Sequence, residues 1–328
     1  MKAVWKAISG HFSDLWGAWD WFWFSPADPV VLCAIRVLTG ALLFWTHLVW
    51  SFDLSGFLGP EGWLAPELIA QKQAGRFVFS LFDWIGPAWL LWTVHVLYLV
   101  VCLMLMFGLF SRVVAVLAFL GALSYVEHVT PGAFFGLDKI NCLLAMYVML
   151  GPCGARYSVD RLRAERRGDE EPGAGAEPSI SANIAIRLMQ LHLCVVYLFS
   201  GLGKLQGELW WNGRAVWFSV ANPEYRSLDM TWLANHLWLV DALTHATVLW
   251  ELFYCWAIWN PLLRPWVLLG AIGIHGFIGL GMGMPEFALS MLVANMAFLA
   301  PVFIEGLFDR PARWASALFR PRKAAAEA

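Results

Sequence analysis

The sequence predicts an all-α membrane protein: a helix bundle with about eight transmembrane helices and additional amphipathic helices at the interface. Hydrophobic residues make up 60% of the 328 residues, charged residues only 14%, and the mean hydropathy is +0.62. Soluble domains are nearer one quarter charged. The 21 Trp and 23 Phe residues suit the aromatic belts found at both faces of a bilayer. The lipid bilayer is therefore the first partner that the composition predicts.

The charge and the cysteine content argue against two further classes of function, nucleic-acid binding and metal binding. A formal net charge of -2 and a pI near 6.4 argue against a nucleic-acid partner, because binding phosphates needs a basic surface. The six cysteines lie inside or beside apolar runs, and none forms a CxxC pair or a Cys/His cluster with zinc spacing. We therefore expect small buried cysteine side chains and no metal site.

The first 27 residues are expected to lie in the membrane interface. They read MKAVWKAISGHFSDLWGAWDWFWFSPA and mix Trp and Phe with Lys and Asp. A cleaved signal peptide needs a continuous apolar core and a small-residue cleavage site, and this stretch has neither. We predict an amphipathic helix along the bilayer surface. A transmembrane domain over 28–305 and a basic cytoplasmic tail over 306–328 follow it.

Eight segments reach or approach the roughly 20 apolar residues that a membrane crossing requires. They are residues 29–51, 87–109, 112–127, 137–151, 183–203, 237–259, 264–283 and 286–304. The third and fourth segments are short, so their assignment as a pair of membrane crossings is the least defined part of this count. Turn signals support other breaks between the spans, at Gly59-Pro60, Asn260-Pro261 and Pro285.

The loops give the orientation. If the N-terminus is cytoplasmic, the inner segments carry most of the Lys and Arg that lie between and beyond the spans, as the positive-inside rule requires. We predict a multi-pass plasma-membrane protein with both termini in the cytoplasm. Residues 161–183, RLRAERRGDEEPGAGAEPSISAN, combine a charge run with Gly, Pro and Ser, and are expected to form a mobile cytoplasmic linker.

Ionisable side chains inside the predicted spans are few. Each costs about 2.5–3.5 kcal/mol at a helix centre, so each should face the protein interior. Arg36, Arg187 and Glu251 lie nearer the cytoplasmic side of the first, fifth and sixth spans. We expect them to form structural ion pairs, with the carboxylate between two guanidinium groups. His47 and the other isolated histidines are expected to be hydrogen-bonded packing residues.

A lysine interrupts the apolar run YLFSGLGKLQGELWW, at the outer end of the fifth span. Tyr197 and Ser200 are seven and four residues before Lys204 and share its helical face. Two nearby glycines allow close helix packing. Burial in such a setting favours the neutral amine, which can act as a general base. The alternative is an anchor that extends to the membrane surface, the commoner role of a lysine there.

The predicted topology places further polar residues at the outer depth of Lys204. His275 lies in GIHGFIGLGMGM, where small neighbours leave space beside the ring, and Asp138, Lys139 and Asn141 open the fourth span. We expect an outer-leaflet pocket with Lys204 as the catalytic base. His275 would orient the substrate or stabilise its developing anion. Substrate or quinone would be bound by Tyr197, Ser200, Asp138, Lys139 and Asn141.

Four runs, in order along the chain, resemble the vitamin K-dependent gamma-glutamyl carboxylases and the broader HTTM domain family to which their membrane domain belongs. DPVVLCAIRVLTG (28–40) resembles the Asp-Pro and Phe-Arg signature of the first span, and RYSVDRL (156–162) the Ser-Val-Asp run after the fourth. VYLFSGLGKL (196–205) resembles the segment of the catalytic lysine, which falls on Lys204. GIHGFIGLGMGM puts His275 on the active-site histidine. The resemblance covers about 25–305.

The resemblance implies a reaction and its cofactors. In the carboxylases the lysine deprotonates reduced vitamin K, O2 adds, and the resulting strong base removes a gamma proton from a glutamate, which then takes up CO2. Vitamin K hydroquinone or menaquinol, with O2 and CO2 as co-substrates, is therefore expected here. The chain departs from the vertebrate carboxylases in having Gly203-Lys204 where they have two lysines, in the polar residues of the fourth span where they have a histidine, and in lacking their lumenal domain.

Two classes of function follow from these features. The leading hypothesis is an enzyme that uses a quinol to modify a secreted peptide or a lipid at the outer face. The alternative is a non-enzymatic membrane protein for the maturation, export or immunity of a secreted peptide. A transporter is disfavoured, because the two halves of the chain show no convincing repeat. The Trp-rich outer loops 56–77 and 206–232 would receive a peptide or cover the pocket.

Overall fold

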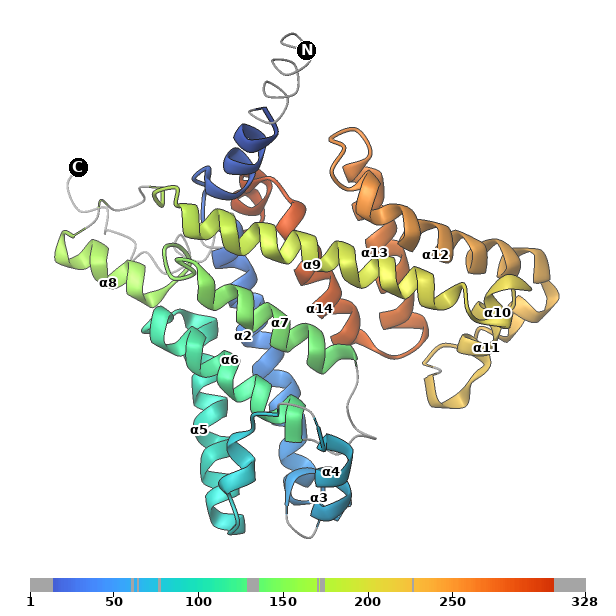
Figure 1. Ribbon diagram of the computed structural model, residues 1–328, viewed down its shortest axis with the longest axis horizontal. Helices are drawn as coiled ribbons and strands as arrows, with labels where there is room; N and C mark the ends of the chain where they lie inside the picture. The colour runs from blue at the N-terminus through green and yellow to red at the C-terminus, as the bar shows by residue number, and fades with distance from the viewer. Residues whose placement is uncertain are drawn as a thin grey trace, which may run out of the picture.

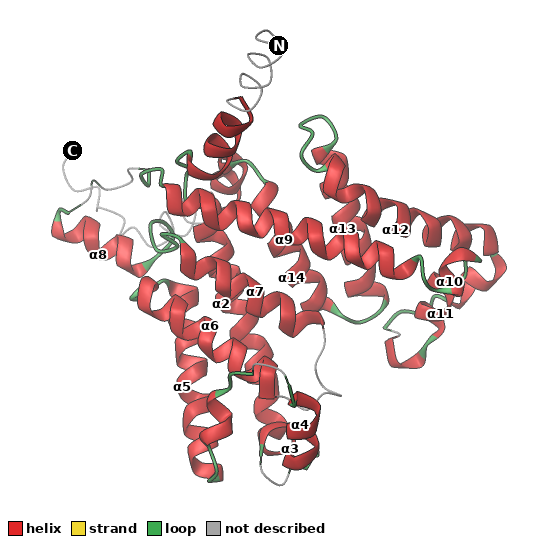
Figure 2. Cartoon of the chain, in the orientation of Figure 1, coloured by secondary structure: helices red, strands yellow, loops and turns green. Residues whose placement is uncertain are grey.

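The computed structural model describes residues 14–59, 62–63, 65–75, 78–128, 136–169, 171, 175–225 and 227–309. Within these ranges the chain is helical throughout and has no strand (Figures 1 and 2). The one isolated bridge joins the backbones of Ala27 and Ser179, with N–H···O distances of 3.1 and 3.0 Å. The all-α prediction is confirmed.

Eight long helices correspond in order to the eight predicted segments. They are α2 (Val30–Trp50), α5 (Ala88–Phe107), α6 (Ser111–His128), α7 (Gly136–Leu150), α9 (Ile180–Lys204), α12 (Leu237–Ala257), α13 (Arg264–Gly281) and α14 (Pro285–Asn295), which a 3-10 turn extends over Met296–Phe298. Four helical stretches in the described part are long and apolar enough to cross a membrane: Val30–Leu58, α5, α6 and α9. The chain is therefore a helical membrane bundle, and the count of eight crossings stays a prediction.

Short helices occupy the segments between the long ones. These are α3 (Leu54–Leu58), α4 (Pro66–Gln73), α10 (Glu208–Trp211) and α11 (Ala215–Ala221) in the two Trp-rich loops, with 3-10 turns at Leu81–Trp84 and Thr231–Asn235. Residues 14–24 are helical, as the predicted N-terminal helix requires, and 1–13 lie outside the described residues. The last described helix covers 301–309, so most of the basic tail is outside the described chain.

The predicted linker begins with a helix. Residues Val159–Arg167 form α8, and α9 begins at Ile180, inside the segment expected to be a linker. The Ser158 hydroxyl caps α8 by accepting from the Arg161 N–H at 2.9 Å, and Arg161 pairs with Glu165 one turn later at 2.9 Å. Capping and an i,i+4 ion pair stabilise a helix without an apolar face, so hydrophobic periodicity does not reveal it.

Helix α2 forms the centre of the bundle (Figure 1). It packs against α5, α7 and α14, while α6 packs against α7, α9 against α12, and α13 against α14. The first turns of α2 are almost wholly buried, from Val30 to Arg36. The carboxylate of Asp28 accepts from the Val30 N–H at 2.8 Å and so satisfies a donor at the start of this helix.

Arg36 joins α2 to the ends of two other segments. Its side chain is fully buried; Nη1 donates to the carbonyls of Leu105 and Met106 at 2.8 and 3.2 Å, and Nη2 donates to the Tyr157 carbonyl at 2.5 Å. Gly108 ends α5 with φ +67°, and a Cβ at this position would clash with the guanidinium. Arg36 therefore binds two carbonyls in the last turn of α5, where a helix leaves carbonyls without their i+4 donors.

Asp160 caps α6 from the first turn of α8. Its carboxylate accepts from the N–H groups of Phe110 and Ser111 at 2.9 and 2.7 Å, and from the Ser111 hydroxyl at 2.7 Å. Two flanking non-glycine residues, Phe110 and Tyr157, have φ of 51° and 53°, an uncommon left-handed conformation. The runs DPVVLCAIRVLTG and RYSVDRL thus meet in a cluster that ties together the ends of α2, α5, α6 and α8.

Candidate functional site

Lys204 ends α9 and forms an ion pair with Glu251 of α12. Its Nζ donates to both carboxylate oxygens, at 2.7 and 2.9 Å, and to the Ser200 hydroxyl at 2.7 Å. The side chains are 19% and 9% exposed, so solvent screens the pair little. Trp210, from the short helix α10, lies with its ring centre 5.1 Å from Nζ, a cation–π contact. Lys204 is therefore held on all sides rather than extended to the surface.

The predicted ion pairs between Glu251 and the two arginines are wrong. Glu251 pairs with Lys204, and Arg36 binds backbone carbonyls at the other side of the bundle. Arg187 donates to Gln190 at 3.1 Å, and its guanidinium lies 4.5 Å from the ring centre of Phe22. Carbonyl oxygens bind the terminal nitrogens of Arg36, and an amide oxygen and an aromatic face hold Arg187, in both cases without a carboxylate. The Glu251 carboxylate therefore pairs with Lys204 instead.

A second hydrogen-bonded group is centred on Tyr197, about two helical turns before Lys204 on α9. Tyr197 of α9 contacts His275 of α13, with 2.7 Å between the hydroxyl and Nε2. Asn295 of α14 donates from Nδ2 to the Tyr197 hydroxyl at 2.9 Å, and its Oδ1 accepts from the Tyr254 hydroxyl at 2.8 Å. Trp250 packs edge-on against Tyr197 at 4.9 Å. Side chains of four helices therefore gather around Tyr197.

The direction of these hydrogen bonds can be assigned. Nδ2 of Asn295 also lies 2.9 Å from the Met291 carbonyl, which can only accept, and this fixes the orientation of the amide. The Tyr197 hydroxyl accepts from Asn295, and His275 Nε2 is the one acceptor within its reach among the described residues. We therefore assign the hydroxyl proton to Nε2, because the other tautomer leaves both the hydroxyl proton and Nδ1 unpaired. His275 then carries its proton on Nδ1, which is buried without a hydrogen-bond partner in the described part of the chain. A buried donor of this kind is costly unless a ligand accepts from it.

An apolar cavity of about 610 Å³ lies between α2, α13 and α14, within the size range of small-molecule sites. Leu38, Ile272 and Leu289 are among its apolar lining residues, and Asn295 reaches it from α14. Lys204 and His275 do not line it. The cavity therefore adjoins the Tyr197 group through Asn295 and lies apart from the lysine.

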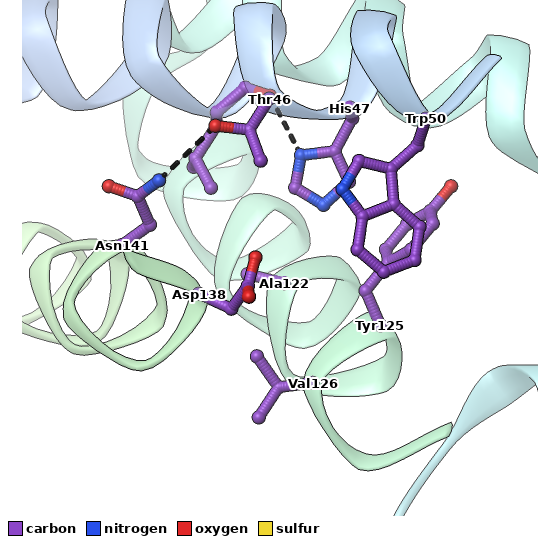
Figure 3. Close-up of a pocket in the computed structure, with 9 residues that line it drawn as sticks. Thr46, His47, Trp50, Ala122, Tyr125, Val126, Asp138 and Asn141 are labelled. Carbon is purple, nitrogen blue, oxygen red and sulfur yellow. Dashed lines mark hydrogen bonds between the residues drawn. The ribbon is translucent and has the colours of Figure 1, made fainter. Parts of the chain in front are cut away.

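The polar residues at the start of α7 are not brought to Lys204. Asp138 and Asn141 line a different, much smaller cavity with residues of α2 and α6 (Figure 3), and the Asn141 amide contacts the Thr46 hydroxyl at 3.5 Å. Lys139 is exposed on the helix surface. The expectation of a single pocket is thus corrected: Lys204, Ser200 and Tyr197 of α9 gather with His275 of α13, and the start of α7 belongs to another site.

Sequence reasoning missed three participants: Asn295, Tyr254 and Trp210. Asn295 is an isolated amide in an apolar segment, and such a residue usually faces a partner inside a membrane bundle, so this signal was available. The roles of Tyr254 and Trp210 have no comparable signal, because aromatic residues are frequent throughout the chain.

The arrangement suits proton transfer and the binding of an oxygen anion. Glu251 can accept a proton from the Lys204 ammonium along a hydrogen bond of 2.7 Å, which leaves a neutral amine beside a neutral acid. His275 Nδ1 can donate to a developing anion. Within the described ranges, no group of three or more His, Cys, Asp or Glu residues could hold a metal ion.

The family comparison agrees with the arrangement of helices. The sequence model of the HTTM domain matches residues 24–302, from before α2 to the end of the bundle. No curated protein and no solved structure matches the chain. Because the match covers most of the chain, the protein belongs to the HTTM domain family.

Proposed function

We propose that this protein is a membrane enzyme with vitamin K-dependent carboxylase-like chemistry, in which Lys204 and Glu251 act together as the base that deprotonates a quinol. The observation that carries the proposal is the double contact of the Lys204 ammonium with the Glu251 carboxylate, at 2.7 and 2.9 Å, about two helical turns along α9 from the Tyr197–His275 contact. Two acid–base groups so close together in a membrane bundle favour function over anchoring.

The residues fit a lipid-soluble quinol in two respects. The cavity of about 610 Å³ is lined mainly by apolar side chains, as an isoprenoid quinol requires. The unpartnered Nδ1–H of His275 needs an acceptor, and a phenolic oxygen is one. Asn295 joins the two regions, because it lines the cavity and donates to Tyr197. These are reasons for the proposal, and both vitamin K hydroquinone and menaquinol satisfy them.

Each residue has a defined task in this mechanism. Glu251 takes the proton from the Lys204 ammonium, and the neutral amine can then accept the proton of a phenol. Ser200 and the Trp210 ring hold Nζ in place, while the Nδ1–H of His275 is positioned to donate to an oxygen anion. When bound, a quinol would supply, through its oxidation by O2 to the epoxide, the strong base that removes a gamma proton from glutamate, to which CO2 would add.

The substrate is proposed to be a secreted peptide that approaches from the outer face of the plasma membrane. The segment that contains α10 and α11 carries Trp210 beside Lys204, so an extended chain lying along this segment would pass close to the amine. The loop would position the glutamate, while the lipid bilayer delivers the quinol from the side.

A second function is favoured by one observation. All three N–H donors of the Lys204 ammonium are taken by acceptors of the chain itself, as in a purely structural ion pair. On this alternative the protein has no catalytic activity and serves the maturation, export or immunity of a secreted peptide.

One experiment separates these functions. Purified protein in lipid nanodiscs is incubated with menaquinol or vitamin K hydroquinone, bicarbonate and O2, and the quinone epoxide is measured by mass spectrometry. We expect epoxide from the unaltered protein, none from Lys204→Arg, which keeps a charge but supplies no base, and unchanged formation from Arg112→Gln, an exposed control on α6. Folded protein that forms no epoxide with either quinol favours the non-enzymatic function.

A further inference from the structure

Two arginine side chains lie close together far from Lys204, and neither takes part in the chemistry proposed above. Arg187 is on α9, 17 residues before Lys204 and so about 25 Å from it along the helix axis. Arg264 begins α13. Both guanidinium groups contact Trp259: that of Arg187 lies 5.9 Å from the centre of its ring, and Nη2 of Arg264 lies 3.5 Å from its carbonyl oxygen. We call these two residues the arginine pair.

The arginine pair has no carboxylate partner. Neither Arg187 nor Arg264 forms an ion pair within the described chain, and the nearby charge that acts on Arg187 is that of Arg264, which repels it. Asp20 of the N-terminal helix is next in sequence to Trp21, whose ring centre lies 6.0 Å from the Arg187 guanidinium, yet Asp20 pairs with neither arginine. Two like charges held together in a membrane bundle are costly unless an anion binds between them.

Each guanidinium group keeps one terminal nitrogen for a ligand. Arg187 donates from Nη1 to Gln190 at 3.1 Å, and Arg264 donates from Nε to the Ile258 carbonyl at 3.0 Å and from Nη2 to that of Trp259. Nη2 of Arg187 and Nη1 of Arg264 make no hydrogen bond in the part of the chain that the structure describes, and neither atom is buried. These two nitrogens are available to donate to the oxygens of one phosphate group.

Aromatic side chains place the arginine pair at the depth of lipid headgroups. The Asn183 amide fastens the N-terminal helix to α9 by donating to the carbonyls of Phe22 and Trp23 at 2.8 and 3.0 Å. The Phe22 ring lies 4.5 Å from the Arg187 guanidinium and 5.9 Å from the Trp259 ring. The N-terminal helix and the turn between α12 and α13 therefore lie at the same edge of the molecule (Figure 1). Exposed tryptophans flank this contact, as in the aromatic belt of a bilayer: Trp16, Trp19, Trp21, Trp256 and Trp266.

We propose that Arg187 and Arg264 bind the phosphate group of an anionic phospholipid. On the predicted topology this lipid belongs to the cytoplasmic leaflet, where basic pockets between helices bind anionic headgroups. A zwitterionic headgroup carries an ammonium group that the two arginines repel, so the site favours a lipid with a net negative charge. The lipid tails would lie along exposed apolar side chains of α12 and α13, such as Phe253 and Leu269. Binding joins α9 to α13 and so stabilises the folded bundle.

Thermal unfolding of the full chain in detergent micelles tests this proposal. The midpoint is measured while phosphatidylglycerol, phosphatidylcholine or glycerol 3-phosphate is added at pH 7 and one ionic strength. We expect phosphatidylglycerol to raise the midpoint by roughly 2–4 °C with saturation, and the other two to leave it unchanged. An equal rise with phosphatidylcholine would overturn the proposal, because net charge would then not matter. An equal rise with glycerol 3-phosphate would overturn it too, because the ligand would then be a soluble phosphate ester.

Variants assign the effect to the arginine pair. Arg187→Gln and Arg264→Gln should each weaken the binding of phosphatidylglycerol several-fold, since each removes one charge and one donor. Arg112→Gln, which removes an exposed arginine of α6, should bind like the unaltered protein. Undiminished binding by both variants of the pair would exclude this site.

A measurement on the unaltered protein covers the case in which a variant fails to fold, as Arg264→Gln can because Arg264 also binds the Ile258 carbonyl. The chain is reconstituted in nanodiscs with equal amounts of phosphatidylglycerol and phosphatidylcholine, and native mass spectrometry counts the lipids that stay bound after release. One retained phosphatidylglycerol per chain, at several-fold the level of phosphatidylcholine, supports the proposal. Equal retention of the two lipids overturns it.

Discussion

The Lys204 ammonium donates to both carboxylate oxygens of Glu251, at 2.7 and 2.9 Å, and this pair joins the end of α9 to the middle of α12. Both side chains are mostly buried, so each charge depends on the other for its solvation. The pair has energetic consequences whether or not the protein is an enzyme.

Removing one partner should cost more than removing both. Lys204→Met leaves a buried carboxylate unpaired, and we expect the free energy of unfolding to fall by about 3 kcal/mol. The double variant Lys204→Met/Glu251→Leu should recover most of this loss, because no charge is left behind. Denaturant unfolding in detergent, arranged as a double-mutant cycle, measures the coupling. Simple additivity of the two single changes would show that the residues do not interact.

Tyr197→Phe tests the hydrogen-bond chain to His275. Without the phenol proton, His275 Nε2 loses its donor and the imidazole is free to adopt either tautomer. We expect epoxide formation to fall about 10-fold in kcat with little change in KM, in line with the loss of an outer partner that orients an active side chain. Tyr98→Phe, which removes a buried hydroxyl bonded to the Ala118 carbonyl, is the matched control and should leave turnover unchanged.

Gly108→Ala should destabilise the fold because its Cβ would meet the Arg36 guanidinium. Gly168 also has a left-handed backbone, with φ +79°, but nothing lies within 4 Å of its Cβ position. Gly168→Ala therefore carries only the backbone strain, about 1 kcal/mol, and Gly108→Ala should cost about 2 kcal/mol more through overpacking. Thermal unfolding of the two variants gives the difference. Equal losses would mean that the guanidinium moves aside at no cost.

Asp160 should make the fold sensitive to acid. Partial burial alone would raise the pKa of this carboxyl, but hydrogen bonds from the Ser111 N–H and hydroxyl and from the Phe110 N–H, with the nearby charge of Arg163, hold the pKa below the usual 3.8. A depressed pKa contributes stability that is present above the unfolded value and is lost as the pH falls through the folded value. The stability gap between the unaltered protein and Asp160→Asn should be constant above about pH 5 and shrink below pH 4. A gap independent of pH down to pH 3 would contradict this.

The helix over 301–309 should detach when Arg156 is changed. Arg156 pairs with Glu305 and with Asp309, the latter at 3.3 Å, and the Tyr157 hydroxyl donates to Asp309 at 2.9 Å. Arg156→Gln removes both ion pairs, and we expect several-fold faster cleavage near the C-terminus in limited proteolysis. Arg167→Gln, at the exposed end of α8, should be cleaved like the unaltered protein. Equal cleavage of all three would show that the ion pairs do not hold the helix.

Much of the fold follows from the sequence, because apolar length and turn residues are local properties. The eight predicted segments agree with the eight long helices to within a few residues, apart from the earlier end of α14. Helix α8 escaped prediction, since its stability comes from the Ser158 cap and not from an apolar face. The sequence also predicts that one face of α9 carries Tyr197, Ser200 and Lys204, because residue spacing within a single helix defines its faces.

The sequence did not predict which side chains on different helices contact one another. Depth along the predicted spans placed Glu251 near the cytoplasmic side with two arginines and Lys204 at the outer end, yet Glu251 and Lys204 pair. Counting residues from the end of a span therefore gave neither the level of Glu251 nor its neighbours. In the same way, Asp138 and His275 were expected in one pocket, yet α7 and α13 face different parts of the bundle. Such pairings depend on lateral packing, which a single sequence does not encode locally.

The contact between Arg36 and the Tyr157 carbonyl spans 121 residues, and this separation has a consequence for biosynthesis. At roughly 5–20 residues per second, Tyr157 emerges from the ribosome roughly 6–24 s after Arg36. During that interval the first helix holds a guanidinium group in the membrane before its last acceptor exists. Partition of α2 into lipid is therefore coupled to synthesis of α5 and of the segment that precedes α8, and the N-terminal half of the chain should leave the translocon as one unit.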